Sequence, residues 1–196
     1  MRTTRLEAFS DGVIAILITI MVFELKVGAG DDFAALREVL PGLSAYVLSF
    51  VYLGIYWNNH HHMLHTADRV TGGILWANLH LLFWLSLVPA ATGWLGGSGF
   101  AAVPAATYGG VMLMAGLAYF ILQQRIIAAQ GPDSLLKRAV GDDRKGRLSQ
   151  VLYVVGIAAA FVNAWISVAM YVLVALIWLV PDRRVESALG AAARDD

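Results

Sequence analysis

Long apolar runs separated by short polar connections make up most of the chain. The first run, residues 5–25, reads RLEAFSDGVIAILITIMVFEL, and others follow at about residues 41–65, 70–95, 103–127 and 151–180. An apolar run of roughly 20 residues is long enough to cross a bilayer as a helix. The pattern therefore predicts an all-α polytopic membrane protein, with Pro41 in the first turn of the second span and Pro89 late in the third.

The last apolar run is too long for one span. Thirty residues in a single helix would extend about 45 Å, against a hydrocarbon core of ~30 Å. We therefore expect two short helices hinged near Asn163, and six spans in all. Twelve of the 14 lysines and arginines then lie on the side of the two termini, and Lys26 and Arg37 lie on the other. Because basic residues mark the cytoplasmic side, both termini are expected there.

This topology gives the expected organisation: a six-helix transmembrane unit, residues 1–182, and a polar cytoplasmic tail, residues 183–196. Composition agrees, since 59% of the residues are hydrophobic and only 14% are charged, against about 25% charged in soluble domains. The net charge of zero offers no basic surface for nucleic acid. The absence of cysteine excludes disulfides, iron–sulfur clusters and thiolate sites.

The first run carries polar groups that a lipid-facing helix would avoid. Ionisable side chains inside a span are costly and usually face protein or a water path. At 100° per residue, one stripe of the helix collects Arg5, Gly12, Ile16, Thr19 and Phe23. Ser10 and Asp11 point to the other flank, where a carboxylate must find donors within its own subunit. The division indicates a pore-lining helix that is braced from behind.

Two plainer interpretations of this segment stay open. Arg2 and Arg5 satisfy the positive-inside rule by themselves, and Ser10 and Asp11 could cap a helix that starts late. A cleaved signal peptide is disfavoured, because Glu7 and Asp11 do not suit its positively charged first part.

A histidine cluster ends the second run, at His60, His61, His62 and His65. His61 and His65 have the i, i+4 spacing that can chelate a metal, and His60 or His61 could pair with His80 across a haem. However, Asp68 is the one carboxylate nearby in sequence, so a structural role is favoured. We expect no metal site and no cofactor.

Catalytic motifs are missing from the sequence. It has no nucleophile elbow and no glycine-rich phosphate loop, so no enzymatic function is expected. An ion pathway fits better. A column of isoleucine and phenylalanine can gate by dewetting, and a hydroxyl ring can replace part of an ion's hydration shell. One helix cannot enclose a pore, so this requires symmetric assembly about an axis beside the first helix.

Three groups of residues carry a resemblance to a known family: Arg5, Phe9, Ser10 and Asp11 in the first run, Trp57-Asn58-Asn59-His60-His61 in the second, and Asn78, Pro89 and Thr92 in the third. Together they resemble the transmembrane protein 175 family of endolysosomal and prokaryotic potassium-permeable channels. The resemblance covers the whole chain as one six-helix unit. It implies a tetramer whose first helices line a central pore without a carbonyl filter.

Carried over by position, the resemblance implies that Ile16 is the constriction and Thr19 a hydroxyl ring, with further pore rings at Ile20 and Phe23. It also implies that a structural network joins Arg5, Phe9, Ser10 and Asp11 to Trp57, His60, His61 and Asn78.

The resulting hypothesis is a homotetrameric potassium channel of the plasma membrane, modestly selective over sodium, whose partners are its own copies, the lipid bilayer and the permeant potassium ion. Two alternatives stay open: a proton-coupled transporter using Asp11 and the histidines, and a metal- or haem-binding membrane enzyme using His60, His61 and His80.

Overall fold

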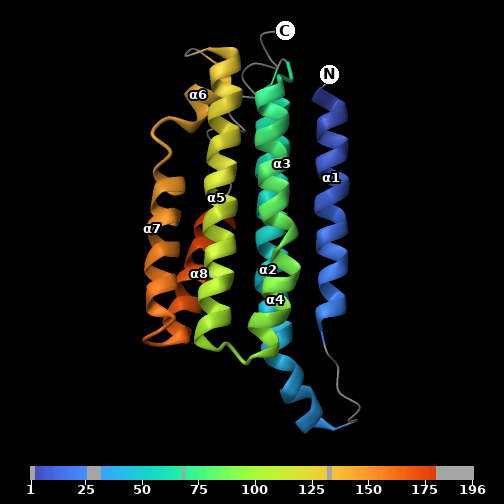
Figure 1. The fold of residues 1–196 in the computed structure, drawn as a ribbon, viewed down its shortest axis with the longest axis vertical. Coiled ribbons are helices and arrows are strands. Elements are labelled where there is room, and N and C mark those ends of the chain that lie inside the picture. The colour runs from blue at the N-terminus through green and yellow to red at the C-terminus, as the bar shows by residue number, and fades with distance from the viewer. Residues whose placement is uncertain (1–2, 26–31, 68, 132–133, 180–196) are drawn as a thin grey trace.

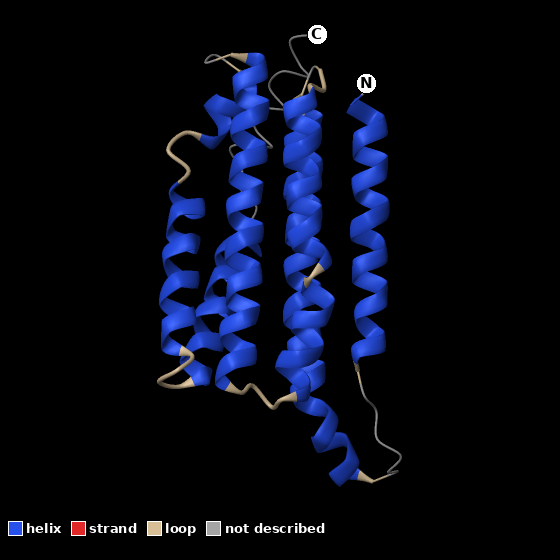
Figure 2. Cartoon of the chain, in the orientation of Figure 1, coloured by secondary structure: helices blue, strands red, loops and turns tan. Residues whose placement is uncertain are grey.

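Helices lie side by side along almost the whole of the protein (Figure 1). The structure, a computed structural model, describes residues 3–25, 32–67, 69–131 and 134–179. Within these ranges every regular element is a helix, and short turns join them (Figure 2). The predicted all-α fold is confirmed. The predicted tail, residues 183–196, lies outside the described residues.

The first helix, α1 (Thr3–Ile20), lies at one edge of the bundle and continues as the 3-10 helix η1 (Met21–Glu24). It packs against α2 and α3, and η1 packs against α4. The side chains that face these neighbours are buried, namely Leu6, Ser10, Ile14, Leu17 and Met21. Their spacing of three or four residues is that of one helix face, so α1 has an inner face and an outer face.

The second helix, α2 (Phe33–His65), starts earlier than the sequence predicted. Asp32 caps it, because its side chain accepts a hydrogen bond from Ala35 N at 2.8 Å. Pro41 lies inside the helix and does not open it, so the prediction that the helix starts at Pro41 was wrong. In Figure 1 the first turns of α2 lean away from the bundle, as expected for a helix with an internal proline.

The third apolar run forms two helices in place of one, α3 (Gly72–Ser86) and α4 (Val88–Gly97). Pro89 is the cause, since proline lacks an N–H and its ring clashes with the carbonyl group four residues earlier. It is tolerated in the first turn of α4, where no such bond is needed. Thr71 caps α3 by accepting a hydrogen bond from Ile74 N at 3.3 Å.

The remaining elements are α5 (Ala102–Gln130), α6 (Leu135–Val140), α7 (Arg144–Ala159) and α8 (Ala164–Leu179). The turn between α7 and α8 falls at residues 160–163, where the sequence predicted a hinge. Tyr171 connects α8 to α5 by donating a hydrogen bond to Ala105 O at 3.1 Å. Its own carbonyl oxygen accepts one from Tyr52 of α2 at 2.5 Å.

Among the described residues, four segments are long and apolar enough to cross a membrane: Thr3–Glu24, Ala35–His65, Gly72–Gly97 and Ala102–Gln130. Helix α8 is apolar but has only 16 residues. Thr3 donates a hydrogen bond to Ala67 O at 3.1 Å, and Gln130 donates one to Thr66 O. The start of α1 and the ends of α2 and α5 therefore meet at one end of a multi-pass membrane protein.

Candidate pore helix and its polar contacts

A buried chain of hydrogen bonds ties α1 to the two helices behind it. His60 Nε2 of α2 lies 2.7 Å from Asn78 Oδ1 of α3, and Asn78 Nδ2 donates to Ser10 Oγ of α1 at 2.9 Å. Ser10 Oγ in turn donates to Leu6 O at 2.9 Å. Because an amide oxygen only accepts, His60 must donate from Nε2. All three polar side chains are fully buried, so each bond replaces one that water would otherwise make.

Other residues of the predicted network do not take part in these hydrogen bonds. Asp11 is half-buried, and its Oδ1 atom has no hydrogen-bond partner within the described part of the chain; the same holds for His60 Nδ1. Trp57 stacks on His61 with ring centres 6.4 Å apart. Arg5 and Phe9 are exposed, and neither forms a hydrogen bond or ion pair with any residue in the described ranges.

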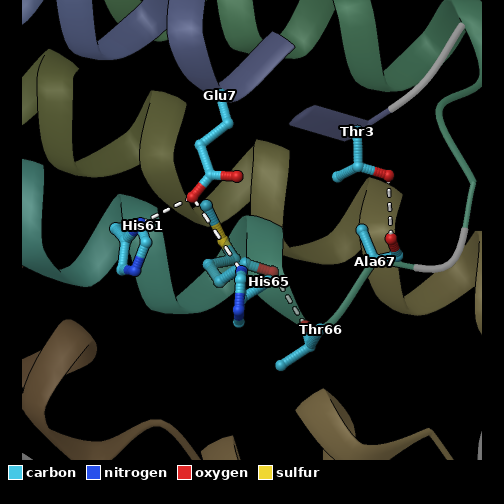
Figure 3. A network of polar contacts seen from close by, with 7 residues as sticks. Thr3, Glu7, His61, His65, Thr66 and Ala67 are labelled. Carbon is cyan, nitrogen blue, oxygen red and sulfur yellow. Dashed lines mark hydrogen bonds and ion pairs between the residues drawn. The ribbon is translucent and has the colours of Figure 1, made fainter. Parts of the chain in front are cut away.

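Glu7 makes a second connection between α1 and α2. Its Oε1 atom lies 2.6 Å from His61 Nδ1 and 3.9 Å from His65 Nδ1 (Figure 3). Glu7 was not among the predicted site residues. The sequence did contain a signal for this role. Glu7 precedes Asp11 by one helical turn, so both carboxylates lie on the same side of α1.

A third polar cluster holds α4 in place. Thr92 Oγ1 lies 2.7 Å from both Ser49 Oγ of α2 and Val88 O of its own helix. Ser49 Oγ is also 3.0 Å from the hydroxyl group of Tyr108 on α5. These three side chains are buried and join α2, α4 and α5. The 3-10 helix η1 packs against α4, so this cluster also supports the end of the first helix. Sequence reasoning singled out Thr92 through the resemblance but missed Ser49 and Tyr108, which come from distant parts of the chain.

The outer face of α1 and η1 carries apolar side chains that are exposed among the described residues. Ile16 is 59% exposed, Ile20 38% and Phe23 83%, although all are large and apolar. Thr19 lies on the same face, exposed, and its Oγ1 is 2.9 Å from Ile16 O and 3.1 Å from Ala15 O. The hydroxyl proton therefore points to the helix backbone, and the free lone pairs of the oxygen point outward.

These features define a polytopic α-helical membrane protein whose first helix is held by buried polar groups on one side and bare on the other. Residues 5–89 match the family described as endosomal/lysosomal potassium channel TMEM175. A Chryseobacterium protein named as a potassium channel is 56% identical over 185 residues, which cover 94% of this chain and 96% of that protein. The chain belongs to the TMEM175 family, which comprises ion channels and not enzymes.

More distant relatives extend the similarity over most of the chain. A Streptomyces collinus protein, also named as a potassium channel, is 31% identical over 191 residues, covering 88% of this chain and 89% of that protein. The crystal structure of a lysosomal potassium-selective channel TMEM175 homologue from Chamaesiphon minutus matches with a TM-score of 0.77 and 28% identity. The match covers 92% of this chain and 97% of that one.

Proposed function

We propose that the protein is a homotetrameric potassium channel of the plasma membrane, modestly selective for potassium over sodium, with α1 and η1 lining its central pore. The observation that carries the proposal is the outer face of α1, where Thr19 stands among exposed apolar side chains. The relatives named as potassium channels support the choice of ion.

Symmetric assembly accounts for this face. Four copies arranged around an axis beside α1 would cover Ile16, Ile20 and Phe23 with the same residues of neighbouring subunits. The opposite face of α1 is already occupied, since Ser10, Ile14 and Leu17 are buried within the subunit. Because one face of α1 packs within its own subunit, only the other face can point towards the symmetry axis of the tetramer.

The proposed conduction mechanism uses two kinds of ring. Four Ile16 side chains form the narrowest apolar constriction, which blocks ions whenever it excludes water. Four Thr19 hydroxyl oxygens, whose protons are turned to the backbone, replace part of the hydration shell of a cation. Potassium holds its water less tightly than sodium and is favoured at such a ring. Ile20 and Phe23 add further apolar rings towards the far end.

The proposed topology has six spans, with both termini in the cytoplasm. Helices α7 and α8 have 16 residues each, which corresponds to about 24 Å. Spans somewhat shorter than the hydrocarbon core are accommodated by local thinning at modest cost. The start of α1 would then lie at the cytoplasmic face, together with the ends of α2 and α5 and most of the basic residues.

A reversal potential tests the proposal directly. The purified protein is placed in a planar bilayer, with potassium on one side and sodium on the other, after its mass has been measured in detergent. We expect four chains of 21.2 kDa per particle, single-channel steps and a reversal near the potassium equilibrium potential. A monodisperse tetramer without current would overturn the proposal. Solute flux that saturates and is lost in Asp11→Asn would instead support the proton-coupled transporter.

A further inference from the structure

We propose that Glu7, His61 and His65 form a binding site for one divalent transition-metal ion of the zinc type, shared between α1 and α2. The three side chains converge at the end of the bundle where α1 begins and α2 ends (Figure 3). The site lies apart from the outer face of α1, and binding there does not depend on whether the protein conducts ions.

The geometry is close to that of a three-ligand zinc site. Each residue offers one ligand atom, and the three atoms lie within 4.8 Å of one another. Glu7 Oε1 is 2.6 Å from His61 Nδ1 and 3.9 Å from His65 Nδ1. Ligands at about 2.0–2.1 Å from a tetrahedral zinc ion stand about 3.3 Å from each other. Zinc binding therefore requires the first distance to widen and the second to shorten, each by less than about 1 Å.

The positions of the three residues on their helices bring the ligand atoms together. His61 and His65 are one turn apart on α2, and their rings stack with centres 5.2 Å apart, so both face Glu7. The Glu7 side chain is only 15% exposed, which restricts its carboxylate, whereas His61 is 41% and His65 64% exposed. An ion can therefore reach the ligands from water, and a water molecule can occupy the fourth coordination position.

The donor set selects the class of ion. Two imidazole nitrogens and one carboxylate oxygen suit zinc and its neighbours in the first transition row, whereas calcium and magnesium need mostly oxygen ligands. A simple ion pair explains Glu7 with His61 but leaves His65 with a weak contact at 3.9 Å. A shared ion gives all three side chains a partner.

Metal binding and thermal unfolding of the purified protein in detergent, first stripped with a chelator, provide the test. Cobalt(II) is titrated while its visible absorption is followed, because tetrahedral coordination by nitrogen and oxygen gives a strong, distinct band. Zinc is then added to see whether it raises the unfolding temperature, since a ligand that binds only the folded protein stabilises it. We expect one ion per chain and a rise in unfolding temperature.

Three variants make the test specific. His65→Gln removes one ligand from an exposed position and should fold normally, as its unfolding temperature without metal will show; Glu7→Gln removes the ligand from α1. His62→Gln is the matched control, because His62 lies next to His61 with ring centres 5.6 Å apart but outside the cluster. We expect cobalt affinity to fall at least about tenfold in His65→Gln and Glu7→Gln, with no zinc-induced stabilisation, and to be unchanged in His62→Gln.

Several results would overturn the proposal. One is the absence of a tetrahedral cobalt spectrum in the wild-type protein. Others are unchanged affinity in His65→Gln, or an equal loss in His62→Gln, which would indicate non-specific chelation by a histidine-rich helix end.

Discussion

Asn78 donates a hydrogen bond to Ser10 at 2.9 Å and accepts one from His60 at 2.7 Å, so a single amide group joins α1, α2 and α3. The carboxamide of Asn78 provides both a donor, its Nδ2 group, and an acceptor, its Oδ1 atom. The donor bonds to α1 and the acceptor bonds to α2. This contact fixes the rotation of α1 about its own axis, because only one face of α1 carries Ser10. The outer face, with Ile16 and Thr19, is oriented as a consequence.

Loss of the Ser10 hydroxyl group is expected to destabilise the fold. In Ser10→Ala the buried Asn78 Nδ2 loses its acceptor, which should lower the free energy of unfolding by about 1–2 kcal/mol. Denaturation in mixed detergent micelles measures it. Ser44→Ala is the control, since Ser44 is exposed and donates only to Leu40 O of its own helix at 2.7 Å. Equal losses in the two variants would refute the role of Ser10.

Gly96 allows α2 and α4 to approach each other closely. A Cβ atom added there would lie 2.6 Å from Gly42 Cα and 3.3 Å from Ala45 Cβ, so backbone would have to move. We expect Gly96→Ala to lower the free energy of unfolding by about 1–3 kcal/mol. Gly97→Ala meets nothing within 4 Å and should be neutral or slightly stabilising. Similar unfolding curves for both variants would contradict the close packing.

Ile16→Asn tests the constriction of the proposed pore. A polar side chain at the narrowest ring should keep it hydrated and raise the potassium current several-fold, measured per channel in a planar bilayer. Ile16→Leu keeps the volume and apolar character and should conduct like the wild type. If Ile16→Asn conducts at the wild-type level, Ile16 does not form the constriction.

Thr19→Val tests the proposed hydroxyl ring. Valine keeps the shape of threonine but removes the oxygen, so current should persist while the potassium-to-sodium permeability ratio falls by about threefold. That factor equals about 0.7 kcal/mol, the scale of one net hydrogen bond. Thr19→Ser retains the oxygen and should keep the ratio, read from the shift in reversal potential. Wild-type selectivity in Thr19→Val would exclude the ring as the selective element.

Much of the architecture follows from the sequence through lengths and angles that hold for any helix. The last apolar run was predicted from its length to divide near Asn163, and the structure places a turn there between α7 and α8. The inner and outer faces of α1 follow from 100° per residue, which places Ser10 and Ile16 on different sides. The pore residues themselves stay predictions until conduction is measured.

Local rules fail where packing outweighs them. The two prolines have the same local effect but different outcomes: Pro41 lies inside α2, whereas Pro89 ends α3 and starts α4. Proline removes one backbone hydrogen bond in either place, so its presence alone does not tell whether a helix continues through it or ends. The preference of proline for the first turn of a helix therefore did not predict that α2 continues through Pro41.

By itself the sequence determined an all-α membrane protein, the division of its last run and the two faces of its first helix, because these depend on hydrophobicity and helical period. Only the tertiary structure decided which polar groups meet. Glu7 lies beside His61 and His65, and Asn78 lies between Ser10 and His60. These partners are far apart along the chain, and the packing of whole helices brings them together.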